Sequence, residues 1–77
     1  MKDLLEFIVK SLVENPDDVE VLEETKGGEI NVKVLVNSAD IGKVIGRGGK
    51  VANAIRVVVR TSATRLNKRV NVKFAEK

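Results

Sequence analysis

The chain has 77 residues, which suffice for one compact domain and are too few for a second hydrophobic core, so we expect a single domain over residues 1–77. It contains no cysteine and no histidine, which excludes disulfides, thiolate metal sites and the commonest general base. Residues 1–40 hold four basic and ten acidic side chains, a net charge of −6, whereas residues 41–77 hold ten basic and one acidic, a net charge of +9.

The first segment, from Asp3 to Glu14, predicts an amphipathic helix because its apolar residues recur at helical spacing. Asp3 and Glu6 have the spacing of a capping pair at its start. Asn15-Pro16 favours the end of this helix, since proline disfavours a helical conformation at the residue before it.

Two runs of alternating apolar and polar residues follow, from Val19 to Thr25 and from Ile30 to Val36, and each predicts a strand. Between them stands the turn sequence Lys26-Gly27-Gly28-Glu29. Glycines between two alternating runs are typical of a hairpin, so we expect the two strands to pair antiparallel.

The second half of the chain predicts two helices and a strand. Side-chain oxygens in residues 37–40 suit a helix N-cap, which favours a short helix over Ile41–Ile45 that Gly46 ends. A long helix is expected from Lys50 to about Asn67, with an apolar stripe made of Val51, Ala54, Ile55, Val58 and Leu66. Alternation over residues 70–74 predicts a last strand.

The resulting order, αββααβ, predicts an α+β fold in two layers, with a three-stranded sheet and the helices packed on one of its faces. We expect Phe7 and Phe74, which stand on apolar stripes, to lie in the core. The chain has no tyrosine or tryptophan, so a surface on which nucleobases stack is not expected.

The stretch from Ile41 to Lys50 concentrates glycines and cations at the junction of the two predicted helices. Glycines allow positive φ and close approach of a ligand, so the three at positions 46, 48 and 49 are expected to present backbone N–H groups. They precede a helix N-terminus, which attracts anions, and Lys43, Arg47 and Lys50 add positive charge. Together with the basic second half of the chain, this pattern favours a phosphate backbone as ligand.

Two phosphate-binding motifs do not fit this stretch. The Walker pattern fails because Val44 and Val51 stand where it needs a glycine and a serine or threonine. The dinucleotide pattern fails because Val51 also replaces its third glycine and no strand precedes it. The pattern that fits is G-x-x-G between two helices, over Gly46–Gly49.

Together with the order of elements and the length, this motif resembles the type II KH domain, in which such a loop clamps the backbone of about four nucleotides. The resemblance covers nearly the whole chain and extends to the small bacterial KhpA family of RNA-binding proteins. It implies single-stranded RNA as ligand, or single-stranded DNA, and a homodimer or a heterodimer with a KhpB/Jag-type KH protein. It further implies an RNA chaperone or post-transcriptional regulator linked to cell shape and division.

Carried onto this sequence, the resemblance assigns three groups of RNA-binding residues. The backbone clamp is Gly46, Arg47, Gly48 and Gly49, the groove wall includes Ile41, Val44 and Ile45, and Lys43 and Lys50 are phosphate contacts. Many KH domains carry a polar or charged side chain where this chain has Gly48, so Arg47 is left as the loop's only charged side chain. No catalytic residue, cofactor or metal is expected.

Other interpretations stay open at this point. The glycines could serve only the geometry of a helix-helix turn, or the chain could be a docking and dimerisation module with secondary nucleic-acid binding. An enzyme is not expected, because the carboxylates of residues 20–29 are far along the chain from the loop. The basic residues after Lys50 are interpreted as a solvated face: Arg56, Arg60, Arg65, Lys68 and Arg69. With no signal-like start and no long apolar run, a cytoplasmic location is expected.

Overall fold

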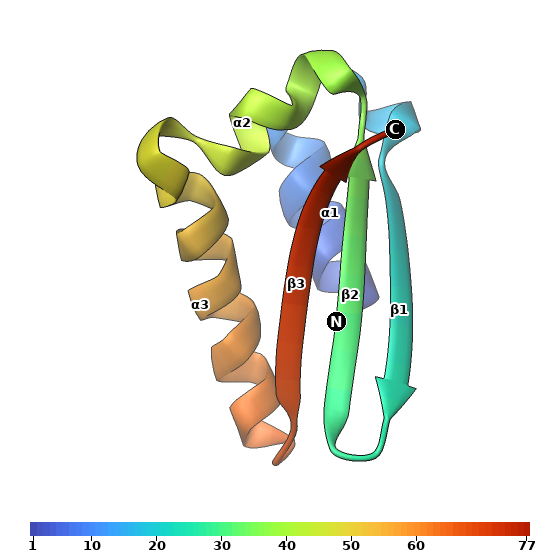
Figure 1. Cartoon of the computed structure of the whole chain (residues 1–77), viewed down its shortest axis with the longest axis vertical. Coiled ribbons are helices and arrows are strands. Elements are labelled where there is room, and N and C mark those ends of the chain that lie inside the picture. The colour runs from blue at the N-terminus through green and yellow to red at the C-terminus, as the bar shows by residue number, and fades with distance from the viewer.

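The computed structural model describes residues 1–77, and its helices and strands follow the predicted order (Figure 1). They are α1 (Lys2–Leu12), β1 (Glu20–Lys26), β2 (Glu29–Val36), α2 (Ile41–Ile45), α3 (Lys50–Arg65) and β3 (Arg69–Glu76). Three short 3-10 turns connect them: η1 (Pro16–Asp18), η2 (Ser38–Asp40) and η3 (Arg47–Gly49). The prediction of an α+β fold with the order αββααβ is confirmed.

The sheet has the strand order β1-β2-β3 and is mixed. β1 and β2 form the predicted antiparallel hairpin, in which Lys26 pairs with Glu29 across the two glycines. β3 pairs parallel to β2, with Val72 beside Val32. Because parallel strands need a long connection, α2, η3 and α3 form the crossover between them. α1 lies behind the sheet and α3 flanks the β3 edge, which leaves the other face of the sheet uncovered (Figure 1).

The hydrophobic core lies between the covered face of the sheet and the helices. β2 alternates strictly and buries four side chains on that face, those of Ile30, Val32, Val34 and Val36. α1 adds Leu5 and Val9, and α3 adds Ile55 and Val59. Apolar burial of this kind stabilises by about 25 cal/mol per Å², so the shared core holds the helices against the sheet.

The apolar stripe predicted for α3 was wrong by about one position. Ile55 is buried as predicted, but the other buried side chains are Ala52, Val59 and Ala63. Val58 is 48% exposed. Three consecutive valines allow two phases of the helix, and the observed one brings the small side chains of two alanines to the core.

Two further predictions were wrong at the level of single side chains. No side chain caps α1, because Met1 occupies the N-cap position and the pair of Asp3 and Glu6 forms no cap. Phe7 is 73% exposed, because it lies on the side of α1 away from the buried Leu5 and Val9. Phe74 is half-buried at the β3 edge.

Candidate nucleic-acid interface

The glycine loop turns the chain from α2 into α3 through three positive φ angles. α2 ends at Gly46, whose N–H donates to the carbonyl of Gly42 at 2.9 Å and whose φ is +75°. Gly48 and Gly49 follow with φ of +64° and +79°. Positive φ is costly for most residues with a Cβ, so this path favours glycine at all three positions.

The glycines of the loop differ in what surrounds them. A Cβ on Gly46 would lie 2.5 Å from Cγ2 of Val51 and 2.9 Å from its backbone nitrogen, so close packing within the protein excludes a side chain there. Around Gly48 there is nothing within 4 Å, and Gly49 has only the amide nitrogen of Asn53 at 3.9 Å. Gly46 therefore shapes the loop, while Gly48 and Gly49 leave its surface open.

The prediction that all three glycines present free N–H groups needs correction. The N–H of Gly46 is used by Gly42, and the N–H of Gly49 donates to the carbonyl of Gly46 at 3.2 Å. The N–H of Lys50 donates to the carbonyl of Arg47. These hydrogen bonds are made within the protein, so the N–H groups of Gly46 and Gly49 are not free to bind a ligand.

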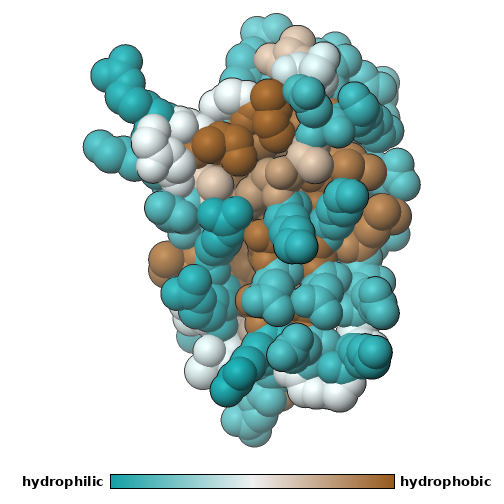
Figure 2. Space-filling view, viewed as in Figure 1, coloured by the Kyte–Doolittle hydropathy of each residue, from teal (hydrophilic) through white to brown (hydrophobic).

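Positive charge surrounds this turn. Arg47 and Lys50 are exposed and neither forms an ion pair. Figure 2 shows hydrophilic side chains projecting from the turn between α2 and α3. No side chain caps the N-terminus of α3, a helix of 16 residues, so its positive dipole end adds to the charges. An anion is the ligand that this environment favours.

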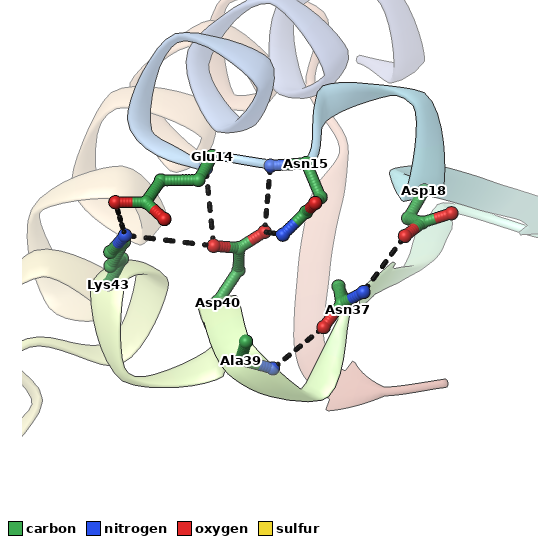
Figure 3. A network of polar contacts seen from close by, with 7 residues as sticks. All are labelled: Glu14, Asn15, Asp18, Asn37, Ala39, Asp40 and Lys43. Carbon is green, nitrogen blue, oxygen red and sulfur yellow. Dashed lines mark hydrogen bonds and ion pairs between the residues drawn. The ribbon is translucent and has the colours of Figure 1, made fainter.

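Lys43 is placed differently from the other two cations. Its ammonium lies 2.7 Å from a carboxylate oxygen of Glu14 and 3.8 Å from Asp40 (Figure 3). The side chain therefore points to the end of α1 and is already neutralised there. A contact between Lys43 and a phosphate requires that it leave Glu14.

Asp40 is a fully buried carboxylate that ties the start of α2 to the end of α1. It accepts hydrogen bonds from the N–H of Glu14 at 3.2 Å and from both the N–H and the side-chain amide of Asn15, at 3.0 and 3.1 Å (Figure 3). Burial raises the pKa of Asp40, but these bonds and nearby Lys43 outweigh it and hold the pKa below its ordinary value of 3.8.

The side-chain oxygens of residues 37–40 were predicted to cap a helix, and only Asn37 does so. Its Oδ1 accepts from the N–H of Ala39 at 2.8 Å, and its amide donates to Asp18 at 2.9 Å (Figure 3). Asp40 instead makes the tertiary bonds described above. Two polar links thus hold the segment before the glycine loop against η1 and the end of α1.

The predicted groove wall is only partly at the surface. Ile41 and Ile45 are half-buried and pack on the core with part of each side chain outside. Figure 2 shows apolar surface gathered over α2. Val44 is fully buried, so it supports this wall from beneath and has no surface for a ligand. The prediction for Val44 is corrected accordingly.

Arg56 was interpreted as a solvated side chain and is instead held at the β3 edge. Its Nε donates to the carbonyl of Val72 at 3.2 Å, and Nη1 donates to Oδ1 of Asn53 at 3.3 Å. The guanidinium lies 5.3 Å from the centre of the Phe74 ring, within the range of a cation–π contact. These groups meet only because α3 packs against β3. No local signal in the sequence therefore indicates that Arg56 makes these contacts.

No group of three acidic side chains lies close enough to hold a metal ion. No helix has the length and apolar character that crossing a bilayer requires.

Known proteins match the chain over nearly its full length. The profile of the KhpA/KhpB KH domain matches residues 2–74. The RNA-binding protein KhpA of Clostridium acetobutylicum is 49% identical, over 96% of this chain and 99% of that protein. KhpA of Clostridium perfringens is 47% identical over the same shares, and KhpA of Bacillus subtilis is 39% identical over 91% of this chain and 86% of that protein. The matched family is one of RNA-binding KH domains and not of enzymes. The chain therefore belongs to the KhpA/KhpB family of KH domains.

Proposed function

We propose that this chain binds single-stranded RNA by holding the sugar-phosphate backbone against the loop Gly46–Gly49. The observation that carries the proposal is the open surface at Gly48, flanked by the unpaired cations Arg47 and Lys50 at the start of a long helix. Its relatives are named RNA-binding proteins, which supports RNA as the ligand. Single-stranded DNA offers the same phosphates and is the ligand to compare with it.

In this proposal the residues of the loop have separate roles. Arg47 and Lys50 contact phosphates, while Gly48 and Gly49 let the backbone approach closely because no side chain stands above them. Ile41 and Ile45 offer apolar contact to bases. Without an aromatic platform or a set of polar groups that reads base edges, such a site holds RNA with low sequence specificity.

A double substitution in the loop tests the proposal. Arg47→Asp with Gly48→Asp reverses the charge of the loop, and aspartate tolerates the left-handed backbone at an open position better than most residues. We expect an unchanged fold by circular dichroism and no binding to a single-stranded RNA in a gel-shift assay. The matched control is Lys26→Asp with Gly28→Asp, which makes the same change of charge in the hairpin turn.

Undiminished RNA binding by the folded loop variant would contradict the proposal. Salt dependence gives an independent measurement, because each phosphate contact of a single strand contributes a slope of about −0.7 to log K against log salt. A flat salt response would also exclude a phosphate clamp.

A second function, pairing with another KH protein, is favoured by an apolar hollow between α1 and α3. It has a volume of about 470 Å³, and six of its seven lining residues are apolar: Ile8, Leu12, Val51, Ala54, Ile55 and Val58. Exposed apolar surface of this kind is typical of an interaction site. We assign it to a second copy of this chain or to a KhpB/Jag-type partner.

Pairing complements RNA binding, because two weak clamps on one strand gain avidity. In the cytoplasm such a pair would act as an RNA chaperone or post-transcriptional regulator, linked to cell shape and division through the family that the chain resembles.

Val58→Asp tests the pairing surface, because it places a charge in the hollow. The fold should tolerate the change, since other residues of α3 pack in the core. We expect sedimentation equilibrium to show dimers of the native chain and monomers of the variant. Leu22→Asp is the matched control, because Leu22 is 47% exposed, nearly as much as Val58, and lies on the uncovered face of the sheet. A monomeric native chain, or a dimeric Val58 variant, would exclude self-pairing through this hollow.

A further inference from the structure

We propose that the free edge of β1 is a docking site for an extended, positively charged segment of a partner protein, which adds to the sheet as a fourth strand. In the strand order β1-β2-β3 one edge of the sheet belongs to β3, which α3 flanks, and the other belongs to β1 (Figure 1). Strand addition to an exposed sheet edge is a recurring mode of peptide recognition. The inference goes beyond RNA binding and does not depend on it.

The backbone of β1 is open on its outer side. β1 pairs with β2 alone, and none of the backbone hydrogen bonds formed outside helices and strands involves residues 20–26. Every second residue of the strand therefore turns its N–H and C=O groups to solvent. Six of the seven residues of β1 are exposed, and the strand has the length that strand addition needs.

β1 is protected from unwanted pairing by charge and not by shape. Proteins often block an edge strand with a proline, a bulge or a covering segment. β1 contains no proline or glycine, and its register with β2 is continuous, so no bulge bends it away. Its acidic residues are Glu20, Glu23 and Glu24, and its one cation is Lys26 at the end of the strand. An acidic strand is repelled by this edge and a basic one is attracted.

The side chains on the uncovered face define the pattern that fits. Glu20, Leu22 and Glu24 share this face, because alternate residues of a strand point to the same side. Leu22 is 47% exposed between the two carboxylates. Side chains directly opposite each other on paired strands interact, so the matching segment has a cation, any residue, an apolar residue, any residue and a cation. Lys33 lies beside Leu22 on β2, on the side away from the added strand.

Both carboxylates of this pattern are available to a partner. Glu24 forms no ion pair. Glu20 lies 3.7 Å from the ammonium of Lys77, but 50% of the Glu20 side chain and 41% of the Lys77 side chain are exposed. An ion pair so open to water contributes little, so a cation of the partner can replace Lys77.

A second copy of this chain does not fit the edge. Antiparallel pairing of two β1 strands about Leu22 would set Glu20 opposite Glu24 on both sides, and like charges directly opposite are destabilising. β3 carries cations, but its outer edge is in use, because Nε of Arg56 donates to the carbonyl of Val72 at 3.2 Å. The occupant is therefore a segment of a different protein.

A synthetic peptide tests the site without RNA. The probe has blocked ends and the sequence Ser-Thr-Lys-Thr-Ile-Val-Lys, which in antiparallel pairing sets its two lysines opposite Glu24 and Glu20 and its isoleucine opposite Leu22. Binding is followed by amide chemical-shift titration of the full chain. We expect the largest shifts in residues 20–26. Glu20→Gln with Glu24→Gln should weaken binding about two- to tenfold, because it removes two cross-strand charge pairs.

The matched control is Asp3→Asn with Asp17→Asn, which removes the same charge from exposed positions outside β1 and should leave peptide binding unchanged. Two N-methylated peptides test the backbone contacts. Only every second N–H of an added strand points to its neighbour, so methylation of alternate residues should abolish binding in one phase and preserve it in the other.

Equal loss of binding in both phases, or equal weakening by the two double variants, would overturn the proposal in favour of general charge attraction. An absence of shifts in residues 20–26 at millimolar peptide would overturn it as well. So would shifts of the β1 amides that depend on protein concentration without peptide, since these would show that a second copy occupies the edge.

Discussion

The ammonium of Lys43 lies 2.7 Å from the carboxylate of Glu14, although 78% of the Glu14 side chain and 40% of the Lys43 side chain are exposed. An ion pair this open to water contributes at most about 1 kcal/mol. Lys43 can therefore exchange Glu14 for a phosphate at little cost, and under the proposed function Glu14 competes with RNA for Lys43.

Glu14→Gln should strengthen RNA binding by about two- to fivefold at low salt, because it frees Lys43 from this partner. The salt slope should also become steeper by about 0.7, the contribution of one added phosphate contact. Fluorescence anisotropy titrations at several salt concentrations measure both. Glu6→Gln removes the same charge from an ion pair with Lys10 elsewhere on the surface, and it should leave the slope unchanged. An unchanged slope for Glu14→Gln would show that Lys43 does not reach the RNA.

Asp40→Asn should destabilise the fold, because the carboxylate accepts three hydrogen bonds and an amide would turn N–H groups toward some of those donors. We expect a clearly lower urea midpoint than that of the native chain. Asp17→Asn, at an exposed position, should have nearly the native midpoint. If the two variants unfold at the same urea concentration, the buried network does not hold α2 against α1.

The same carboxylate predicts a pH dependence. The pKa of Asp40 is lower in the folded chain than its ordinary value of 3.8, so its contribution to stability is fully present above that value. The contribution is lost as the pH falls through the lowered folded pKa. The difference in urea midpoint between the native chain and Asp40→Asn should therefore be constant near neutral pH and shrink below about pH 4. A difference that grows in acid would contradict this assignment.

Two glycines close together in the chain should respond to alanine in opposite directions. Gly46→Ala places a Cβ 2.5 Å from Val51 and keeps a positive φ, so we expect a loss of about 2–4 kcal/mol in the free energy of unfolding. Gly42→Ala meets no atom within 4 Å and lies inside α2, so we expect a gain of about 0.5–1 kcal/mol. Urea denaturation of both variants tests the pair, and equal effects would show that loop packing does not require Gly46.

The order of elements was predictable from the sequence because each helix or strand has a local signal. The alternation in β2 and the glycines at its start specify the hairpin, and Gly46 ends α2 as predicted. The sequence did not predict which side of α3 is buried. Apolar stripes through Val58 or through Val59 fit the sequence equally well, and only the packing of α3 against the sheet buries Val59.

The residues of the candidate site were predictable where their role is local. The glycines belong to a contiguous motif, and the structure gives each of them a positive φ. The parts that depend on tertiary contacts were missed. Asp40 finds its donors 25 and 26 residues earlier in the chain, and Arg56 finds Val72 only after β3 has joined the sheet. Spacing along a single sequence carries no signal for such partners.

The parallel pairing of β2 with β3 makes the order of synthesis matter. The glycine loop leaves the ribosome before β3 does, yet β3 completes the sheet that α3 packs against and supplies the carbonyl that holds Arg56. Domains of this size fold as units, so a nascent chain that lacks β3 has the loop sequence without a rigid frame. If the loop binds RNA as proposed, a nascent chain is expected to hold RNA only after β3 has paired with β2.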